Sequence, residues 1–247
     1  MRRVEQVMGL PVSVDLRDGD ADGDADGARS AAVDRAFAWL REVDARFSPF
    51  RPDSEVCRLD RGELDPADVS ADLAHVLDLC AHYERATGGA FSARVPGRPL
   101  DPCAVVKGWA VQRAADLLAG AGATSFAVNA GGDVATAGGP WRVGLRHPLD
   151  PTAFSAVLTV TDRAVATSAR YERGDHILDA RTGRPVTDLL SLTVVAPDLT
   201  TADATATAAF AMGAAGVEWA AARPGCEVHA VDAAHRVHRT PGLPVAA

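Results

Sequence analysis

The stretch from Phe126 to Gly138, "FAVNAGGDVATAG", constrains the fold most strongly, because an apolar strand runs directly into a bare backbone. Phe126 and Val128 are spaced as in a buried strand. The pair Gly131–Gly132 and Asp133 then follow. Glycines adopt positive φ and admit close approach by a ligand or by other backbone, and their N–H groups can line an anion site. A Gly-Gly-Asp hairpin turn explains the same residues, so both interpretations stay open.

Helical and extended patterns alternate along the rest of the chain. Apolar periodicity predicts a helix over 28–47 and another over 70–87, with Ser70 as N-cap and Gly88-Gly89 as a left-handed exit. A third helix is expected from near Lys107. The remaining segments are an opening strand over 4–16, the strands "WRVGLRH", "FSAVLTV", "RAVATS" and "SLTVVA", an alanine-rich helix ending at Gly213, and a closing hairpin in "CEVHAVDAAHRVHRT". This order predicts one α+β domain over 1–247, with mixed sheets flanked by helices.

Charge and composition exclude several classes of protein. The chain has 247 residues and a formal net charge of −8, which argues against a broad basic surface for nucleic acid. No segment approaches the roughly 18 apolar residues that a membrane span needs, and the N-terminus has no lipid-attachment cysteine. We therefore expect a cytoplasmic protein, monomeric or homodimeric, without nucleic-acid or membrane partners. The cysteines at 57, 80, 103 and 226 lack metal or disulfide spacing, so reduced and mostly buried thiols are expected.

The aspartate-rich segment "RDGDADGDADG" resembles the first half of a calcium loop. The second half is missing, because the twelfth position from Asp18 is Arg29, and from Asp22 it is Val33, where such a loop requires a glutamate. We predict a flexible acidic loop over 15–27 instead.

The alanine-rich segment "TTADATATAAFAMG" is a candidate metal site. On a helix, Asp203 and Thr207 stand one turn apart on the same face. A carboxylate and a hydroxyl are oxygen ligands of the kind that Mg²⁺ prefers, usually together with substrate phosphates. The alternative is an acidic residue that complements the helix dipole beside an exposed threonine.

Two further segments carry chemically useful side chains. In "DHILDARTGRP", His176 lies near Asp179, an arrangement suited to proton transfer or phosphate contact, although a lone histidine can equally be a packed or surface residue. In "DPCAVVKGWAV", Asp101 and Lys107 flank an apolar run. A lysine in the first turn of a helix opposes the dipole, and a bound anion would remove that conflict.

Taken together and in order, these blocks resemble the ApbE family of FAD:protein FMN transferases. The likeness also includes "VMGLPVSV", "DARFSPFRPDSEVCRLDRG" and "TGGAFSA", and it covers nearly the whole chain. It implies an enzyme that binds FAD, cleaves the pyrophosphate with Mg²⁺, and transfers FMN to a threonine hydroxyl of an acceptor protein with release of AMP.

The resemblance also implies roles for individual residues. The carbonyl of Ala104 and the side chains of Asp203 and Thr207 would hold Mg²⁺. Lys107 would stabilise phosphate charge, and His176 or a carboxylate such as Asp203 would accept the threonine proton. The FAD contacts would be Met8, Ala90, Phe91, Asp101, Lys107, Asn129, Gly131, Gly132, Asp133, His176 and Ile177.

The chain departs from the family pattern in places. Leu10 stands where the family has a threonine after Met-Gly, and Ser92 stands where it has an aspartate. Only eight residues separate Ser92 from Asp101, where many relatives carry a long insertion. Two alternatives to transfer are therefore a protein that holds FAD unchanged and a Mg²⁺-dependent FAD pyrophosphatase that gives FMN and AMP.

Overall fold

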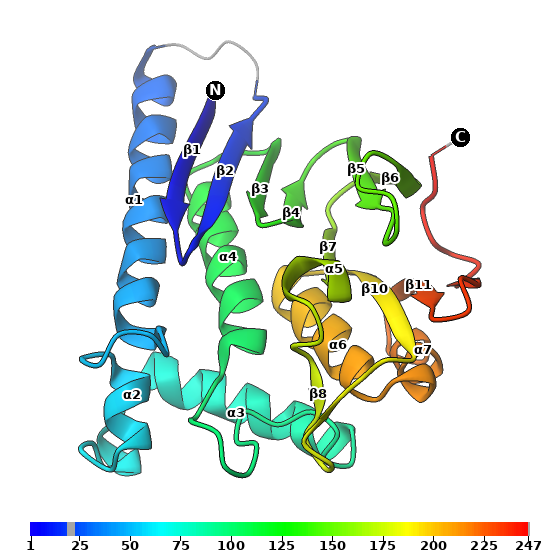
Figure 1. Cartoon of the computed structure of the whole chain (residues 1–247). Helices are drawn as coiled ribbons and strands as arrows, with labels where there is room; N and C mark the ends of the chain where they lie inside the picture. Colours follow the sequence, from blue (N-terminus) through cyan, green and yellow to red (C-terminus); the bar gives the residue numbers. More distant parts are fainter. Residues whose placement is uncertain (19–22, 247) are drawn as a thin grey trace.

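The computed structural model describes residues 1–18 and 23–246 (Figure 1). The strands are β1 (Arg2–Val7), β2 (Leu10–Leu16), β3 (Phe126–Ala130), β4 (Asp133–Ala137), β5 (Trp141–Arg146), β6 (Phe154–Val160), β7 (Ala164–Ala169), β8 (Leu178–Asp179), β9 (Arg184–Pro185), β10 (Leu189–Ala196), β11 (Glu227–Asp232) and β12 (Val237–Arg239). The helices are α1 (Gly23–Phe47), α2 (Glu55–Asp60), α3 (Ala71–Ala86), α4 (Cys103–Gly120), α5 (Arg170–Arg173), α6 (Leu199–Ala211) and α7 (Ala214–Ala221), and a 3₁₀ turn spans Pro66–Asp68.

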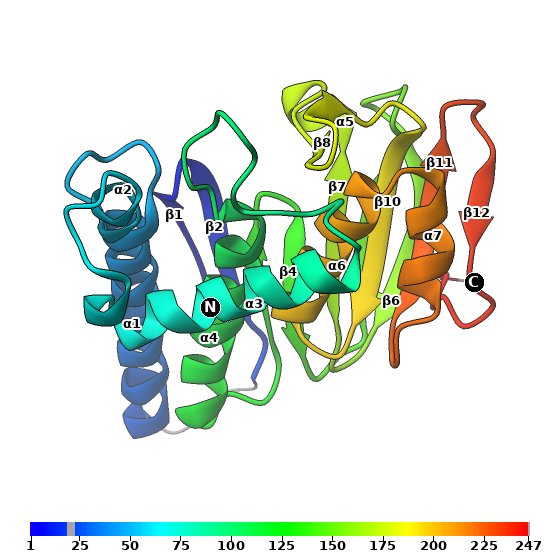
Figure 2. The same cartoon turned by 90° about the horizontal axis from the view of Figure 1, so that it is seen from below.

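Eight of the described strands form one sheet in the order β1-β2-β3-β4-β7-β10-β11-β12. Figure 2 shows this order running from the blue strands on one side to the red strands on the other. Every strand pairing in the described part of the chain is antiparallel. The predicted α+β class is confirmed. The four strands predicted after Asp133 are also present, as β5, β6, β7 and β10.

Helices cover one face of this sheet. Helix α4 packs against β3 and β4, α6 against β7 and β10, and α7 against β11. Figure 2 shows α3 crossing in front of α4 and α6, and both crossings are contacts. One large cluster of buried apolar side chains runs between the two layers, from Val12 in β2 to Val228 in β11. The sheet and the helices that carry the predicted site therefore share a core.

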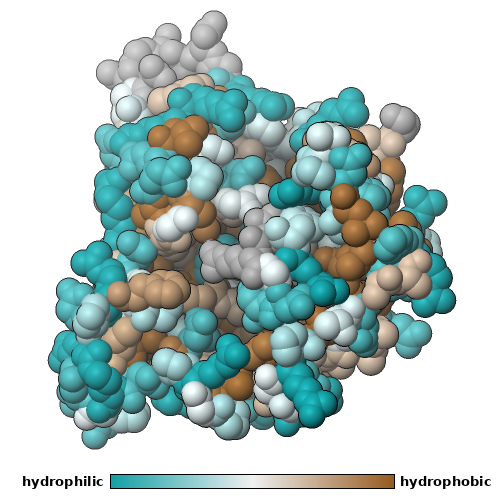
Figure 3. All heavy atoms as spheres, viewed as in Figure 1, coloured by the Kyte–Doolittle hydropathy of each residue, from teal (hydrophilic) through white to brown (hydrophobic). Residues whose placement is uncertain are grey.

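The second face is covered only in part. The β5–β6 hairpin lies over β7 and β10, where Trp141 and Leu158 pack with Val165 and Val195. On the face drawn in Figure 3, brown atoms interrupt the hydrophilic surface near this hairpin. Leu149 and Phe154 are 53% and 65% exposed there. Apolar residues thus stand both beneath the hairpin and on its outer surface.

Helix boundaries differ from the sequence prediction in two places. Helix α1 starts at Gly23 rather than Ala28, and α4 starts at Cys103 rather than near Lys107. Residues 23–27 of α1 include no large apolar residue, so periodicity did not reveal this turn. The added turn of α4 contains the buried Val105 and Val106, which read as an apolar run before the helix. Within the segment predicted as a flexible loop, β2 continues to Leu16 and the Asp18 carboxylate accepts hydrogen bonds from Thr124 and Ser125. Residues 19–22 lie outside the described residues.

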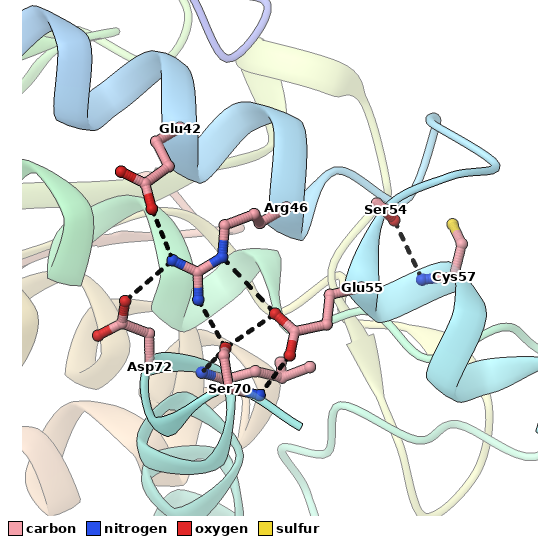
Figure 4. Close-up of polar contacts among 8 residues, drawn as sticks. Glu42, Arg46, Ser54, Glu55, Cys57, Ser70 and Asp72 are labelled. Atoms are coloured by element: carbon pink, nitrogen blue, oxygen red, sulfur yellow. Dashed lines mark hydrogen bonds and ion pairs between the residues drawn. The ribbon is translucent and has the colours of Figure 1, made fainter. Parts of the chain in front are cut away.

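A polar network fixes α3 against α1 and α2 (Figure 4). Arg46 donates to Glu42 at 2.9 Å, to Asp72 at 3.1 Å and to Ser70 Oγ at 2.6 Å. Ser70 Oγ donates to Glu55 at 2.8 Å and accepts from the Leu73 N–H at 3.2 Å. The side chain of Ser70 is therefore the predicted N-cap of α3 and also its tie to the neighbouring helices.

The C-terminal end of α3 also agrees with the sequence prediction. The helix ends at Ala86, and Gly88 and Gly89 follow with φ of 59° and 83°. Such positive φ values suit glycine because it has no Cβ. The paired glycines thus give the expected left-handed exit.

All four cysteines are free thiols, as predicted. Their burial is less complete than predicted, since Cys80 and Cys226 are buried but Cys57 is half-buried and Cys103 is exposed at the start of α4. Burial raises the pKa of Cys80 to about 12. Among the helices in the described ranges, none combines the length and apolarity that crossing a membrane requires.

A buried hydrogen bond ties α3 to α6. The hydroxyls of Tyr83 and Thr205 lie 3.1 Å apart, and the two residues are 4% and 0% exposed. Substituting Tyr83→Phe leaves the Thr205 hydroxyl buried without this partner, and we expect the free energy of unfolding to fall by about 1–2 kcal/mol. Urea denaturation measures this change.

A double-mutant cycle with Thr205→Val provides the control. Replacing both partners by apolar groups removes the unpaired hydroxyl, so the double variant should be more stable than the sum of the single changes predicts. Strict additivity of the two single effects would contradict a coupling between these hydroxyls.

Candidate active site

Lys107 lies between two buried carboxylates. Its ammonium group forms ion pairs with Asp133, the first residue of β4, and with Asp203 of α6, where Nζ lies 3.3 Å from Oδ1. Asp133 and Asp203 are only 2% and 3% exposed. The predicted conflict between Lys107 and the helix dipole is wrong, because α4 begins at Cys103 and Lys107 therefore lies in its second turn and not in its first. The positive charge of Lys107 is neutralised by the two carboxylates.

The charges of this cluster do not balance. Burial raises the pKa of Asp203 to about 7, against the lowering effect of Lys107, and the nearby Asp133 raises it further. The two carboxylates in turn hold the pKa of Lys107 above its ordinary value, despite burial. The buried Asp133 Oδ2 is the oxygen that faces the Lys107 ammonium group, and Asp133 Oδ1 accepts from the Thr167 N–H at 2.9 Å. Two carboxylates facing one ammonium group favour a further cation.

Gly108 allows the two helices to meet at Asp203. Its N–H donates to Asp203 Oδ2 at 2.8 Å. A Cβ at this position would lie 2.6 Å from Asp203 Cβ and 2.6 Å from the Leu199 carbonyl oxygen. In a regular α-helix the Gly108 N–H donates to the carbonyl of Ala104. The Asp203 carboxylate therefore competes with the Ala104 carbonyl for this hydrogen.

The three predicted metal ligands lie on α4 and α6, two helices that pack against each other. Asp203 and Thr207 occupy one face of α6, as predicted, and Ala104 lies in the first turn of α4. The alternative, a dipole-complementing aspartate beside an exposed threonine, does not describe Thr207, which is half-buried and lies 3.0 Å from Ser168 Oγ. The N-cap of α6 is Asp198, which accepts from the Thr201 N–H at 2.8 Å. No group of three or more His, Cys, Asp or Glu side chains in the described ranges could hold a metal. A carboxylate, a hydroxyl and a carbonyl nonetheless suit Mg²⁺, which takes oxygen ligands.

The bare segment of the sequence is a hairpin turn. Gly131 and Gly132 connect β3 to β4 with φ of 61° and 100°, and Asn129 Oδ1 accepts from the Gly132 N–H at 3.0 Å. Positive φ at both central residues is the requirement of a type I′ turn, a common two-residue hairpin connection. The turn interpretation is therefore confirmed, and the same turn delivers Asp133 to Lys107.

Met8 lies in the equivalent turn between β1 and β2. It adopts a φ of 54°, which is unusual for a bulky residue, and is followed by Gly9 at 72°. The two turns are neighbours, since the Gly131 N–H donates to the Pro11 carbonyl at 3.3 Å and Leu10 packs against the open side of Gly131. Met8 and the Gly131–Gly132 turn thus lie at the same end of the sheet as the Lys107 cluster.

The segments around Phe91 and His176 are joined to each other. The Ala180 N–H donates to the Ala90 carbonyl at 2.9 Å, and Arg181 lies against Gly89. Ala90 and Phe91 are buried, whereas His176 is exposed and Ile177 is half-buried. The short connection between Ser92 and Asp101 forms a loop whose ends are joined by a hydrogen bond, in which the Asp101 N–H donates to the Ala93 carbonyl at 2.9 Å.

One predicted side-chain arrangement takes a different form. Asp179 pairs with Arg181 and not with His176, whose Nδ1 lies 3.0 Å from the Gly174 carbonyl oxygen. The sequence proximity of His176 and Asp179 therefore does not produce a contact. Asp101 is exposed, and its Oδ1 accepts from the Cys103 N–H at 3.0 Å, where it begins α4.

Sequence reasoning missed Gly108, Thr167 and Ser168. The Thr167 N–H donates to Asp133 Oδ1 at 2.9 Å, and Ser168 Oγ lies 3.0 Å from Thr207 Oγ1. A glycine inside a helical pattern signals close packing, so Gly108 could have been found. The two β7 residues carried no such signal.

Comparison with known proteins agrees with the resemblance found in the sequence. The family model described as the ApbE family matches residues 8–97 and 93–230. The chain belongs to the ApbE family. An "FAD:protein FMN transferase" of Klebsiella pneumoniae (strain 342) is 34% identical over 159 residues, covering 60% of this chain and 50% of that protein. One of Rhodobacter capsulatus is 30% identical over 188 residues, covering 71% of this chain and 33% of that protein. The chain thus spans half or less of these curated relatives.

Solved structures of ApbE proteins share the fold. The ApbE protein of Thermotoga maritima superposes with a TM-score of 0.84 at 21% identity, covering 98% of this chain and 97% of that one. The flavin transferase ApbE from Vibrio cholerae superposes with a TM-score of 0.80 at 23% identity, with the same coverage. At these identities, the structures establish the ApbE fold for nearly the whole chain.

The contact of Gly108 with Asp203 is testable by adding one methyl group. In Gly108→Ala, the new Cβ meets the Asp203 side chain and the backbone of Leu199, so α4 and α6 must separate. We expect the free energy of unfolding in urea to fall by about 2 kcal/mol. Gly120→Ala in the same helix is the matched control, because its Cβ meets no atom within 4 Å. Equal stability of both variants would contradict the close approach.

Proposed function

We propose that this ApbE-family chain is a Mg²⁺-dependent FAD:protein FMN transferase, acting as a single domain over 1–247. The reaction cleaves the pyrophosphate of FAD, attaches FMN through a phosphoester bond to a threonine of an acceptor protein, and releases AMP. The observation that carries the proposal is the buried cluster of Lys107, Asp133 and Asp203 beside Thr207, with its excess of carboxylate charge. The names of the relatives, FAD:protein FMN transferase, support the choice of substrate.

The oxygen donors of Ala104, Asp203 and Thr207 would hold the metal. Their chemistry fits, since Asp203 lies where two carboxylates share a single ammonium group and Thr207 presents a half-buried hydroxyl. When bound, Mg²⁺ supplies neutralisation of pyrophosphate charge and acts as a Lewis acid. A ligand set made only of oxygen atoms suits Mg²⁺ and is poorly suited to soft metals.

Lys107 would bind the phosphates while remaining charged. Its two carboxylate partners keep the ammonium group protonated, and its side chain is 31% exposed, so one side of it is open to a ligand. Positioning of the phosphates by a fixed cation accounts for much of the rate in phosphoryl transfer. Asp133 would act on Lys107 rather than on FAD, because its carboxylate is buried against that lysine.

His176 would accept the proton of the acceptor threonine. Its Nδ1 faces the Gly174 carbonyl at 3.0 Å, which favours the tautomer with hydrogen on Nδ1. Nε2 is then the acceptor of the ring. The exposure of His176 leaves it reachable by an acceptor protein, which a base for an incoming side chain requires.

The remaining predicted FAD contacts come from segments near the same end of the sheet. The turns at Met8 and at Gly131–Gly132 are adjacent, and the Ala90–Phe91 loop is tied to the segment of His176 and Ile177. Two other functions remain as competing proposals. One is FAD binding without transfer, and the other is hydrolysis of FAD to FMN and AMP. The buried carboxylates favour turnover over simple binding, because holding FAD needs no metal.

Incubation of the purified chain with FAD, Mg²⁺ and a threonine-containing acceptor domain tests the proposal. We expect the intact mass of the acceptor to rise by one FMN residue, with AMP released in equal amount. Asp203→Ala and removal of Mg²⁺ with EDTA should each lower the rate by at least about 100-fold, since metal stabilisation of charge contributes several kcal/mol.

Two outcomes would support the alternatives. AMP and FMN formed without a change in acceptor mass would support the pyrophosphatase. FAD bound but unchanged would support the binding protein. Asp198→Asn is the matched control, because Asp198 caps the same helix, one turn before Asp203, without contacting the Lys107 cluster in any described interaction.

A further inference from the structure

Strand β7 touches both halves of the site through consecutive residues. The backbone N–H of Thr167 donates to Asp133 Oδ1 at 2.9 Å, and the side chain of Ser168 lies 3.0 Å from Thr207 Oγ1. Successive side chains of a strand point to opposite faces of the sheet. Accordingly Ser168 faces α6, whereas the Thr167 hydroxyl bonds to Thr193 at 2.8 Å on the other side. One strand therefore holds the carboxylate that faces Lys107 and the hydroxyl of the proposed metal ligand.

The requirement on Thr207 follows from the chemistry of a hydroxyl group. A threonine side chain has one hydrogen to donate and two lone pairs to share. An oxygen that binds a cation uses a lone pair, so its hydrogen must point away from the cation and toward an acceptor. In the described structure, the side-chain partner of the Thr207 hydroxyl is Ser168 Oγ.

Ser168 is well placed to impose this orientation. It is 7% exposed and lies within β7, in register with Leu192 of β10. Its position is thus set by the central sheet and does not depend on the helix that carries Thr207. A hydroxyl anchored in this way can fix the rotation of its partner, in the same manner as the outer partners of metal ligands in proteins generally.

We propose that Ser168 is a positioning residue that accepts the Thr207 hydrogen bond and so directs a Thr207 lone pair toward the metal. This inference rests on the metal site of the proposed function. It assigns no catalytic contact to Ser168 itself. Its consequence is that the metal affinity of the site depends on a strand residue as well as on the residues that supply the ligands.

Titration of the full chain with Mn²⁺ in the presence of FAD tests the inference, with free Mn²⁺ followed by electron paramagnetic resonance. Mn²⁺ takes the same oxygen ligands as Mg²⁺. We expect Ser168→Ala to weaken Mn²⁺ binding by about tenfold or more, as the loss of an outer partner generally does. Ser168→Thr, which keeps the hydroxyl on a β-strand, should restore most of the affinity.

Ser191→Ala is the matched control, since Ser191 is a buried serine of the adjacent strand β10, paired with Ala169 and not with Thr207. We expect it to bind Mn²⁺ as the wild type does. Binding of FAD in the absence of metal, followed by flavin fluorescence, should be unchanged in Ser168→Ala. Loss of both FAD and Mn²⁺ binding in that variant would overturn the inference in favour of a general structural role.

Asp203→Ala separates the two proposals. If wild type binds Mn²⁺ more tightly than Asp203→Ala but Ser168→Ala matches wild type, the positioning role fails and the proposed metal site stands. If wild type and Asp203→Ala bind Mn²⁺ equally, the metal site itself fails, and the role of Ser168 fails with it. A tenfold loss in Ser168→Ala, recovered in Ser168→Thr, supports both.

Discussion

The ammonium group of Lys107 holds together three elements that are far apart in sequence. It joins α4 to the start of β4 through Asp133 and to α6 through Asp203. Burying charges carries a desolvation penalty that their mutual attraction only partly offsets. A buried charge cluster of this kind therefore need not increase the stability of the fold. The neighbouring backbone reduces the penalty, because the N–H groups of Gly108 and Thr167 each donate to one of the carboxylates. The ligand site proposed above would account for an arrangement that stability alone explains poorly.

Local patterns predicted those parts of the fold that depend on a few consecutive residues. Ser70 and the Gly88–Gly89 pair marked both ends of α3, because caps and left-handed exits are set by single side chains. The Gly-Gly turn and the common face of Asp203 and Thr207 were predictable for the same reason, since two-residue hairpins and helical spacing have fixed geometry. These predictions required no knowledge of which elements pack together.

Local patterns could not predict the pairing of Lys107 with Asp133 and Asp203. It depends on which strand lies beside which helix, and no periodicity in the sequence carries that information. The association of His176 with Asp179 failed for the opposite reason: proximity in sequence indicated a contact, but Asp179 turned to Arg181 two residues away. The earlier start of α4 shows a third limit, because Val105 and Val106 form an apolar run with no polar N-cap residue to mark it as the first turn of a helix.

The strand β7 connects these observations. Beyond its pairing with Val134 and Ala135, its backbone donates from Thr167 to the side chain of Asp133, the first residue of β4, and its alternation places Ser168 against α6. A ligand site formed only by helices would loosen with any shift of α4 against α6. Here a central strand, paired on both sides, contacts the carboxylate beside Lys107 and the hydroxyl of Thr207. The positions of Asp133 and Thr207 are therefore tied to a central strand, while Gly108 lets α4 and α6 approach closely enough for Asp203 to pair with Lys107.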